Sequence, residues 1–235
     1  MRFILLFCTC ALFLNCEDKQ KQQKTTSKTP KLEQKETNKN QKAKPNEEER
    51  EFPKLTSKNA MDFFLEYEKH NKENKVRITT DFGDIDILLY DKTKFHRANF
   101  IFLTKLNYFD DTQFYRVINN FMVQAGNSDT RATARKRSNI GRYLLPTDTK
   151  RGYTHERGAI SMPSGEIDNP YKLASPFEFF IVQQRGGASF LDGDYTIFGK
   201  VIRGMEVVDK IAAVATDEAD WPLENIYIKK VEIIK

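Results

Sequence analysis

The sequence contains very little cysteine, and all of it lies near one end of the chain. The three cysteines, Cys8, Cys10 and Cys16, fall within the first 16 of 235 residues. The rest of the chain therefore has no disulfide bond, no thiol nucleophile and no thiolate ligand for a metal. This absence excludes thiol catalysis and thiolate–metal sites from the main part of the protein.

Histidine is equally scarce, and its three positions do not form a site. His70 ends a polar helical stretch and His96 opens a helix, whereas His155 lies in HERGAISM, where a structural hydrogen bond is the expected role. No two histidines have metal-ligand spacing, and there is no HExxH motif, GxSxG elbow or Walker loop. The paired acids Asp110 and Asp111 are typical of a turn. We therefore expect no hydrolase chemistry, no metal and no cofactor.

The N-terminus has the pattern of an export signal. Arg2 is followed by an apolar run from Phe3 to Leu14, too short to span a bilayer, and Cys16 lies just after the run. This pattern resembles a bacterial lipoprotein signal, although Asn15 stands where a small residue is usual. We expect a signal peptide over residues 1–15, lipidation of Cys16 and a lipid-anchored protein of the bacterial cell envelope, periplasmic or surface-exposed. An ordinary cleaved signal is the alternative.

Residues 16–55 are polar, low in complexity and almost free of large apolar side chains. Such a segment cannot bury enough surface to offset the entropy of ordering, so we expect a disordered tether with an end-to-end distance of roughly 35 Å. The whole chain has 38 basic and 33 acidic residues, of which 26 and 25 lie in residues 56–235. A domain so close to neutrality is not expected to bind nucleic acid.

The remaining residues predict a short helical segment and then one domain. SKNAMDFFLEYEKH has apolar residues at helical spacing, which predicts a short amphipathic helix within residues 56–75. Residues 76–235 read as a β-hairpin over 76–90, helices near 94–106 and 205–214, and many short strands between turn residues. This pattern favours a closed β-barrel or a sandwich. The basic cluster between Arg131 and Arg142 predicts a solvated loop, with a surface for acidic partners as the lesser alternative.

The segment FYRVINNFMVQAGN, residues 114–127, places a permanent cation among apolar side chains. Arg116 stands between Phe114 and Val117 in a stretch that reads as paired strands. Strand alternation directs Met122 and Gln124 to one face and their neighbours to the other, unless a bulge intervenes. The pattern indicates a polar group held beside an apolar surface.

These blocks resemble the cyclophilin family. The resemblance rests on FYRVINNFMVQAGN, GAISM, EFFIV and FLDGDYTIFGKV, which occur in the family's order between residue 76 and the C-terminus. It implies a mainly β fold, an eight-stranded closed antiparallel barrel capped by two helices, and peptidyl-prolyl cis–trans isomerase activity on proline-containing polypeptide segments. It implies Arg116 and Gln124 as catalytic residues. It also implies a set of substrate-binding residues: Phe121, Met122, Pro163, Ser164, Glu178, Phe180, Phe190, Leu191 and Tyr195.

The chain departs from the family pattern at several of these positions. Glu178 stands where many relatives have glutamine, and its carboxylate could orient Arg116 or compete with substrate for it. Tyr195 replaces a common histidine, Phe190 replaces a tryptophan, and Pro163 adds bulk beside the expected peptide path. Three functions therefore stay open: an active isomerase, a module that holds proline-containing segments without turnover, and a ligand-binding β-barrel lipoprotein. We expect a monomer in each case.

Overall fold

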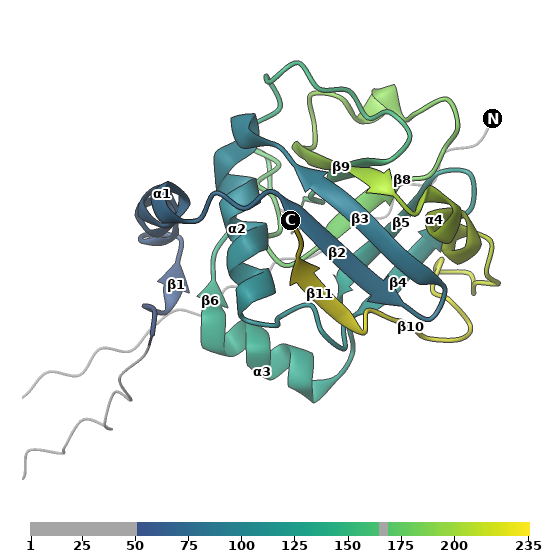
Figure 1. Cartoon of the computed structure of the whole chain (residues 1–235), viewed down its shortest axis with the longest axis horizontal. Coiled ribbons are helices and arrows are strands. Elements are labelled where there is room, and N and C mark those ends of the chain that lie inside the picture. The colour runs from purple at the N-terminus through teal and green to yellow at the C-terminus, as the bar shows by residue number, and fades with distance from the viewer. Residues whose placement is uncertain (1–50, 165–168) are drawn as a thin grey trace, which may run out of the picture. The chain divides into compact units, whose positions relative to one another are not determined.

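The computed structural model describes residues 51–164 and 169–235 (Figure 1). The predicted signal peptide, Cys16 and most of the predicted tether lie outside the described residues. Within the described ranges, no helix is both long and apolar enough to cross a membrane.

Most of the fold is one sheet of nine antiparallel strands. Their order across the sheet is β10-β4-β5-β8-β7-β9-β3-β2-β11. The predicted hairpin is present as β2 and β3, which pair from Lys75–Leu88 to Thr80–Gly83. The strands are β2 (Lys75–Thr80), β3 (Gly83–Leu89), β4 (Gln113–Ile118), β5 (Met122–Asn127), β7 (Ala159–Ser161), β8 (Phe179–Val182), β9 (Ile197–Arg203), β10 (Ile226–Tyr227) and β11 (Lys230–Ile233).

The sheet curls but does not close, so the predicted eight-stranded closed barrel is wrong. The two edge strands are β10 and β11, which adjoin in sequence yet pair with β4 and β2 respectively. The chain crosses between the edges at Ile228 and Lys229, whose N–H groups donate to the carbonyls of Thr112 and Thr79, each at 2.8 Å. The run IYIKKVEII reads as a single strand in sequence. In the structure this run forms two strands, β10 and β11, which gives the sheet nine strands. Residues 228 and 229 connect these two edge strands.

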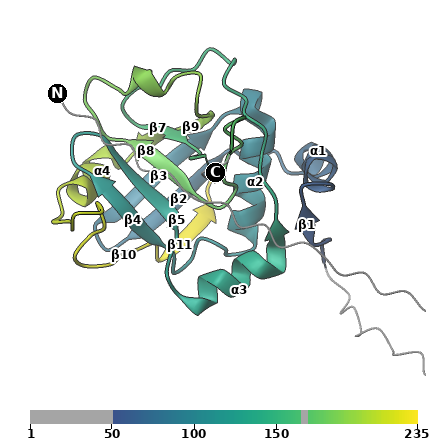
Figure 2. The same ribbon diagram turned by 180° about the vertical axis from the view of Figure 1, so that it is seen from behind.

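Two helices lie on opposite sides of the curled sheet in both views (Figures 1 and 2). They are α2 (Lys94–Lys105), entered through the short helix η1 (Asp91–Thr93), and α4 (Met205–Ala212). Both were predicted from sequence within a few residues. In α4, the side chains of Val207, Val208, Ile211 and Ala212 are buried, as expected for one apolar face of an amphipathic helix.

A small N-terminal unit packs on the outside of α2 (Figure 1). It consists of β1 (Leu55–Thr56) and α1 (Ala60–His70), which lies in the segment where the sequence predicted a helix. The ring of Phe64 is completely buried and meets Phe102 of α2 edge to face at 5.8 Å. Leu55 is also completely buried, because β1 pairs in parallel with β6 (Gly141–Arg142). These contacts join residues 51–70 to the main domain.

The basic cluster predicted as a loop is instead the helix α3 (Arg131–Ile140). Thr130 caps its N-terminus by accepting a hydrogen bond from the N–H of Thr133. Only Thr133 and Ile140 are buried, so the helix has almost no apolar face to reveal it. Its one ammonium group anchors the helix, since Lys136 Nζ donates to three main-chain carbonyls, the closest being that of Asp110 at 2.6 Å.

The alternation of β5 and β8 separates two apolar regions. Val123, Phe179 and Ile181 belong to the main core together with the buried faces of α2 and α4. Met122 and Phe180 point to the other face and belong to a second, smaller cluster. That second cluster adjoins the cavity described next.

Candidate functional site

A bulge in β4 sets the geometry of the site. Phe114 pairs with Ala125, and the next pair is Arg116 with Gln124. Between these pairs β4 is longer than β5 by one residue, and Tyr115 is that extra residue. A bulge of this kind changes the direction of the side chains that follow it. As a result Arg116 and Gln124 lie directly opposite one another on neighbouring strands.

Next to this pair is a cavity of about 300 Å³. The sheet supplies part of its wall, with Met122 and Gln124 from β5 and Phe180 from β8, and the short helix η2 (Ser189–Leu191) supplies Leu191. The ring of Tyr195 stands edge-on to that of Phe180 with centroids 5.8 Å apart. The full lining is Arg116, Phe121, Met122, Gln124, Pro163, Ser164, Phe180, Leu191 and Tyr195. The structure therefore brings nine of the eleven predicted catalytic and substrate-binding residues to one cavity.

The guanidinium of Arg116 is partly exposed at this cavity. Its side chain is 45% exposed, and it is paired with Asp220, whose Oδ2 lies 3.3 Å from both Nε and Nη2. Ion pairs between side chains as exposed as these contribute at most about 1 kcal/mol. The ion pair therefore leaves part of the guanidinium accessible to a substrate.

Gln124 is fixed by a residue of the bulge. Its Nε2 donates to the hydroxyl oxygen of Tyr115, whose ring packs against Trp221 at 5.7 Å. Burial raises the pKa of Tyr115 well above its ordinary value, and the nearby Glu178 carboxylate adds to the rise. The phenol therefore stays neutral, and it holds the Gln124 amide in place.

Two predicted residues do not line the cavity. Glu178 was expected near Arg116, but its carboxylate accepts a hydrogen bond of 2.9 Å from Arg137 of α3. The prediction failed because α3, which supplies this competing arginine, was not predicted. Phe190 lies beside the cavity rather than in it. The residue is 66% exposed, and its ring stacks on that of Phe121 with centroids 5.6 Å apart.

Pro163 lines the cavity with its main chain already engaged. Its carbonyl accepts a hydrogen bond of 2.8 Å from the N–H of Ser175, and proline has no N–H to donate. The side chain of Ser164 is also engaged, because its Oγ lies 3.1 Å from Nδ2 of Asn169. Pro163 therefore offers a substrate its apolar surface more readily than its backbone groups.

His155 has the structural role that the sequence predicted. Its Nδ1 lies 2.6 Å from Asp192 and its Nε2 lies 3.1 Å from Oγ of Ser161. Burial lowers the pKa of His155, and Asp192 opposes that shift. These are the residue types of a hydrolytic triad, but Ser161 is completely buried and its Oγ donates to the carbonyl of Thr196. The cluster instead fixes Asp192, the residue after η2, beside the cavity.

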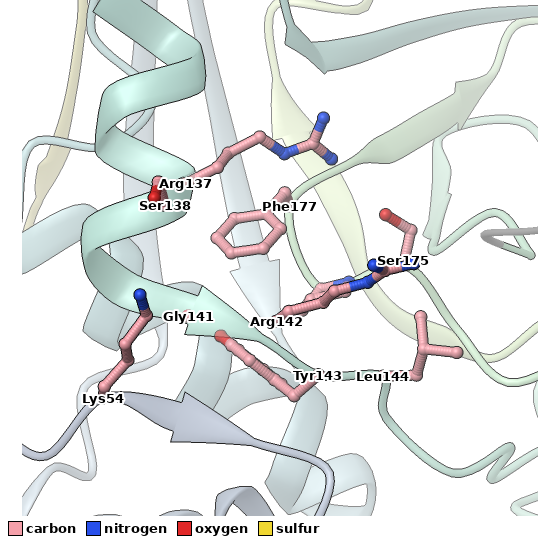
Figure 3. Close-up of a pocket in the computed structure, with 10 residues that line it drawn as sticks. Lys54, Arg137, Ser138, Gly141, Arg142, Tyr143, Leu144, Ser175 and Phe177 are labelled. Atoms are coloured by element: carbon pink, nitrogen blue, oxygen red, sulfur yellow. The ribbon is translucent and has the colours of Figure 1, made fainter.

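A second cavity, of about 400 Å³, was not predicted from sequence (Figure 3). Arg137 and Arg142 come to it from α3 and β6, and Lys54 comes from the segment before β1. Tyr143 and Phe177 add aromatic surface, and the guanidinium of Arg137 lies over the Phe177 ring at 4.9 Å. The basic cluster between Arg131 and Arg142 was noted in the sequence, but a run of charged residues does not indicate a cavity.

A comparison of this sequence with models of known protein families decides its family. A model of the family described as cyclophilin type peptidyl-prolyl cis-trans isomerase/CLD matches residues 75–233. This chain belongs to the cyclophilin family. Residues 75–233 thus form a cyclophilin-type peptidyl-prolyl cis-trans isomerase domain, as the resemblance implied, and β1 and α1 precede it.

Individual cyclophilins support this assignment. The chain is 37% identical over 165 residues to a peptidyl-prolyl cis-trans isomerase of Acinetobacter baylyi, covering 68% of this chain and 82% of that protein. It is 35% identical over 169 residues to peptidyl-prolyl cis-trans isomerase-like 2 of Rhizopus delemar, covering 71% of this chain but only 30% of that longer protein. The crystal structure of a Cryptosporidium parvum cyclophilin type peptidyl-prolyl cis-trans isomerase covers 69% of this chain and 98% of its own, with 26% identity and a TM-score of 0.58.

Proposed function

We propose that this cyclophilin accelerates rotation about X-Pro bonds of exported polypeptides, with Arg116 as the hydrogen-bond donor to the twisted amide. The observation that carries the proposal is the position of Arg116, opposite Gln124, at a cavity whose wall includes Phe121, Met122, Phe180 and Leu191. The combination of a cation, an amide and a cavity with apolar walls fits a proline residue with its flanking peptide groups.

The chemistry needs no nucleophile and no metal. Amide resonance sets a barrier of about 18–20 kcal/mol to rotation, and X-Pro exchange takes tens to hundreds of seconds without catalysis. Rotation takes the nitrogen lone pair out of conjugation and makes the nitrogen a hydrogen-bond acceptor. A donor beside the nitrogen then binds the twisted amide more tightly than the planar one, and this difference in binding accelerates the reaction.

We assign parts of the substrate to particular residues of the cavity. Phe121, Met122, Phe180 and Leu191 provide apolar surface for the pyrrolidine ring. Arg116 and Gln124 face one another across β4 and β5, so they meet the peptide groups on either side of the ring. The hydrogen bond from Gln124 to Tyr115 leaves the amide oxygen of Gln124 to accept from a substrate N–H.

The strength of one hydrogen bond limits what Arg116 contributes. A hydrogen bond to a charged group is worth about 1.5–3 kcal/mol, which corresponds to roughly one to two factors of ten in rate. Any larger acceleration comes from orientation of the peptide in the cavity.

Arg116→Ala tests the mechanism. We expect kcat/KM for a proline-containing peptide to fall at least about tenfold, because the lost bond is worth more than ~1.4 kcal/mol. Arg131→Ala is the matched control, since Arg131 is an exposed arginine of α3 that does not line this cavity. A protease-coupled or NMR exchange assay measures the rate, and calorimetry measures peptide binding.

Three results are distinguishable. Unchanged turnover in Arg116→Ala contradicts the proposed role of the arginine. Peptide binding with negligible turnover in both proteins favours a holding module instead. The absence of both peptide binding and turnover favours a different ligand for the cavity.

The export part of the proposal rests on the predicted signal and lipidation site in residues 1–16. We propose that a lipid at Cys16 holds the domain at an envelope membrane through the polar segment 16–55. Its substrates would then be polypeptides that fold after export.

A further inference from the structure

The loop between α4 and β10 carries a carboxylate that faces the proposed catalytic donor. This loop spans residues 213–225, and Asp220 lies within it. One oxygen of Asp220, Oδ2, lies 3.3 Å from both Nε and Nη2 of Arg116. The carboxylate thus occupies one edge of the planar guanidinium.

We propose that Asp220 is the positioning residue for Arg116, and this inference rests on the proposed function above. A guanidinium has five N–H donors in a fixed fork. With Oδ2 on the Nε–Nη2 edge, the two N–H groups of Nη1 and the second N–H of Nη2 are directed away from Asp220. Those three donors are the ones that a substrate peptide can use. Asp220 therefore fixes the rotation of the guanidinium and leaves its other edge for the substrate.

The main chain of Asp220 is anchored to the same strand as Arg116. Its carbonyl accepts a hydrogen bond of 2.8 Å from the N–H of Val117, the residue that follows Arg116. This bond joins the loop to β4 beside the arginine. Asp220 and Arg116 are thereby held close together at both the backbone and the side chain, although they are 104 residues apart in sequence.

The loop has internal hydrogen bonds that keep Asp220 in place. The carboxylate of Asp217 accepts from the N–H groups of Ala219 and Trp221, both at 2.9 Å. The N–H of Asp220 itself donates to the carbonyl of Asp217 at 3.1 Å. Asp220 has a φ of 63°, a left-handed conformation that aspartate and asparagine tolerate better than most residues. The side chain is therefore presented by a structured turn.

The same loop also supports the second polar residue of the cavity. Trp221 packs against Tyr115, and the hydroxyl of Tyr115 accepts from Gln124. This loop therefore contacts Arg116 through Asp220, and it contacts Tyr115, which holds Gln124, through Trp221.

Asp220→Asn is the variant to test, because asparagine keeps the left-handed backbone and removes the charge. The pair is partly exposed, with side chains 45% and 38% accessible, so the effect is modest. We expect kcat to fall about two- to fivefold with little change in KM. We also expect the activity of the unaltered protein to approach that of the variant as salt is raised, because screening weakens exposed pairs. Glu218→Gln, an exposed carboxylate of the same loop, is the control and keeps full activity.

A double-mutant cycle separates positioning from a general effect on the loop. In the Arg116→Ala background, Asp220→Asn should leave kcat unchanged, because the group that it positions is absent. An equal fall in both backgrounds, or a rise in kcat for Asp220→Asn alone, overturns the inference. If Arg116→Ala has no effect by itself, the proposed function fails. If Arg116→Ala lowers kcat and Asp220→Asn does not, the positioning role alone fails.

Discussion

At the scale of single residues, the arginine of the site has a different neighbour from the one predicted. Glu178 belongs to a block that resembles the family, so it was the obvious carboxylate to place beside Arg116. In the structure Glu178 pairs with Arg137, and Asp220 approaches Arg116 instead. A charged side chain in a turn has no periodic pattern around it, and its partner 104 residues away cannot be identified from a single sequence.

The cavity residues were easier to predict, for a physical reason. Phe121, Met122 and Gln124 are fixed by one strand and its turn, so local order places them once the strand is recognised. Phe180 and Leu191 come from blocks that resemble the family in order and spacing. Only the resemblance joined these separate blocks into one site, because strand periodicity does not say which strands are neighbours.

Another buried residue predicts how stability depends on pH. His96 is completely buried in α2, and neither ring nitrogen has a hydrogen-bond partner within the described part of the chain. Burial lowers its pKa from 6.5 to about 4, although Asp148 opposes the shift. The unfolded chain therefore takes up this proton first as the pH falls. Stability is complete above about pH 6.5 and declines by roughly 3 kcal/mol as the pH falls to about 4.

Urea unfolding at several pH values between 7 and 4 measures this decline. His96→Leu should remove the part of the decline that His96 causes, since leucine has no titrating group, and leave the smaller part due to His155, whose pKa burial also lowers. His70→Gln is the control, because His70 lies on the surface. A decline of the same size in His96→Leu would assign it to other groups. Carboxylates such as Asp86, whose pKa Arg77 and Arg203 lower from 3.8, act below this pH window.

At the scale of elements, apolar periodicity determined which helices and strands were predicted. The hairpin of β2 and β3 and the helices α2 and α4 each have a buried apolar face, and each was predicted. The helix α3 has two buried residues in ten and is held by charged side chains, so its pattern resembled a loop. The closed barrel was wrong for a related reason, because periodicity does not show where one apolar run divides into β10 and β11.

The pairing of β1 with β6 gives a prediction at this scale. Gly141 has a φ of 137°, and a Cβ there would lie 2.0 Å from the carbonyl oxygen of Leu55. Gly141→Ala therefore adds backbone strain of about 1–3 kcal/mol and a clash that separates the two strands. We expect hydrogen exchange around Leu55 to increase strongly while isomerase activity changes little.

Gly152→Ala is the matched control for this experiment. Gly152 also has a positive φ, of 78°, but a Cβ there meets no atom within 4 Å. It therefore introduces the strain without the clash, and exchange around Leu55 should stay slow. Slow exchange in Gly141→Ala as well would mean that β1 tolerates the added methyl group.

At the scale of the whole molecule, the proposed attachment to a membrane is open to a direct test. Cys16 precedes the described residues and is the only cysteine after the apolar run. In a bacterial host we expect labelled palmitate to enter the full-length chain, and Cys16→Ser to abolish this labelling and release the domain into the soluble envelope fraction. Cys10→Ser is the control and should label normally. Labelling that persists in Cys16→Ser, or is absent from both proteins, contradicts the anchor.

The pairing of β2 with β11 joins the beginning of the domain to its end. Val76 lies beside Ile233, and Thr79 beside Lys230, so β2, the first strand of the nine-stranded sheet in chain order, acquires one of its two neighbours from β11, the last. Contacts this distant along the chain form slowly. During synthesis, β2 has no partner on this side until β11 has been made. The native sheet can therefore be complete only once β11 has been synthesised.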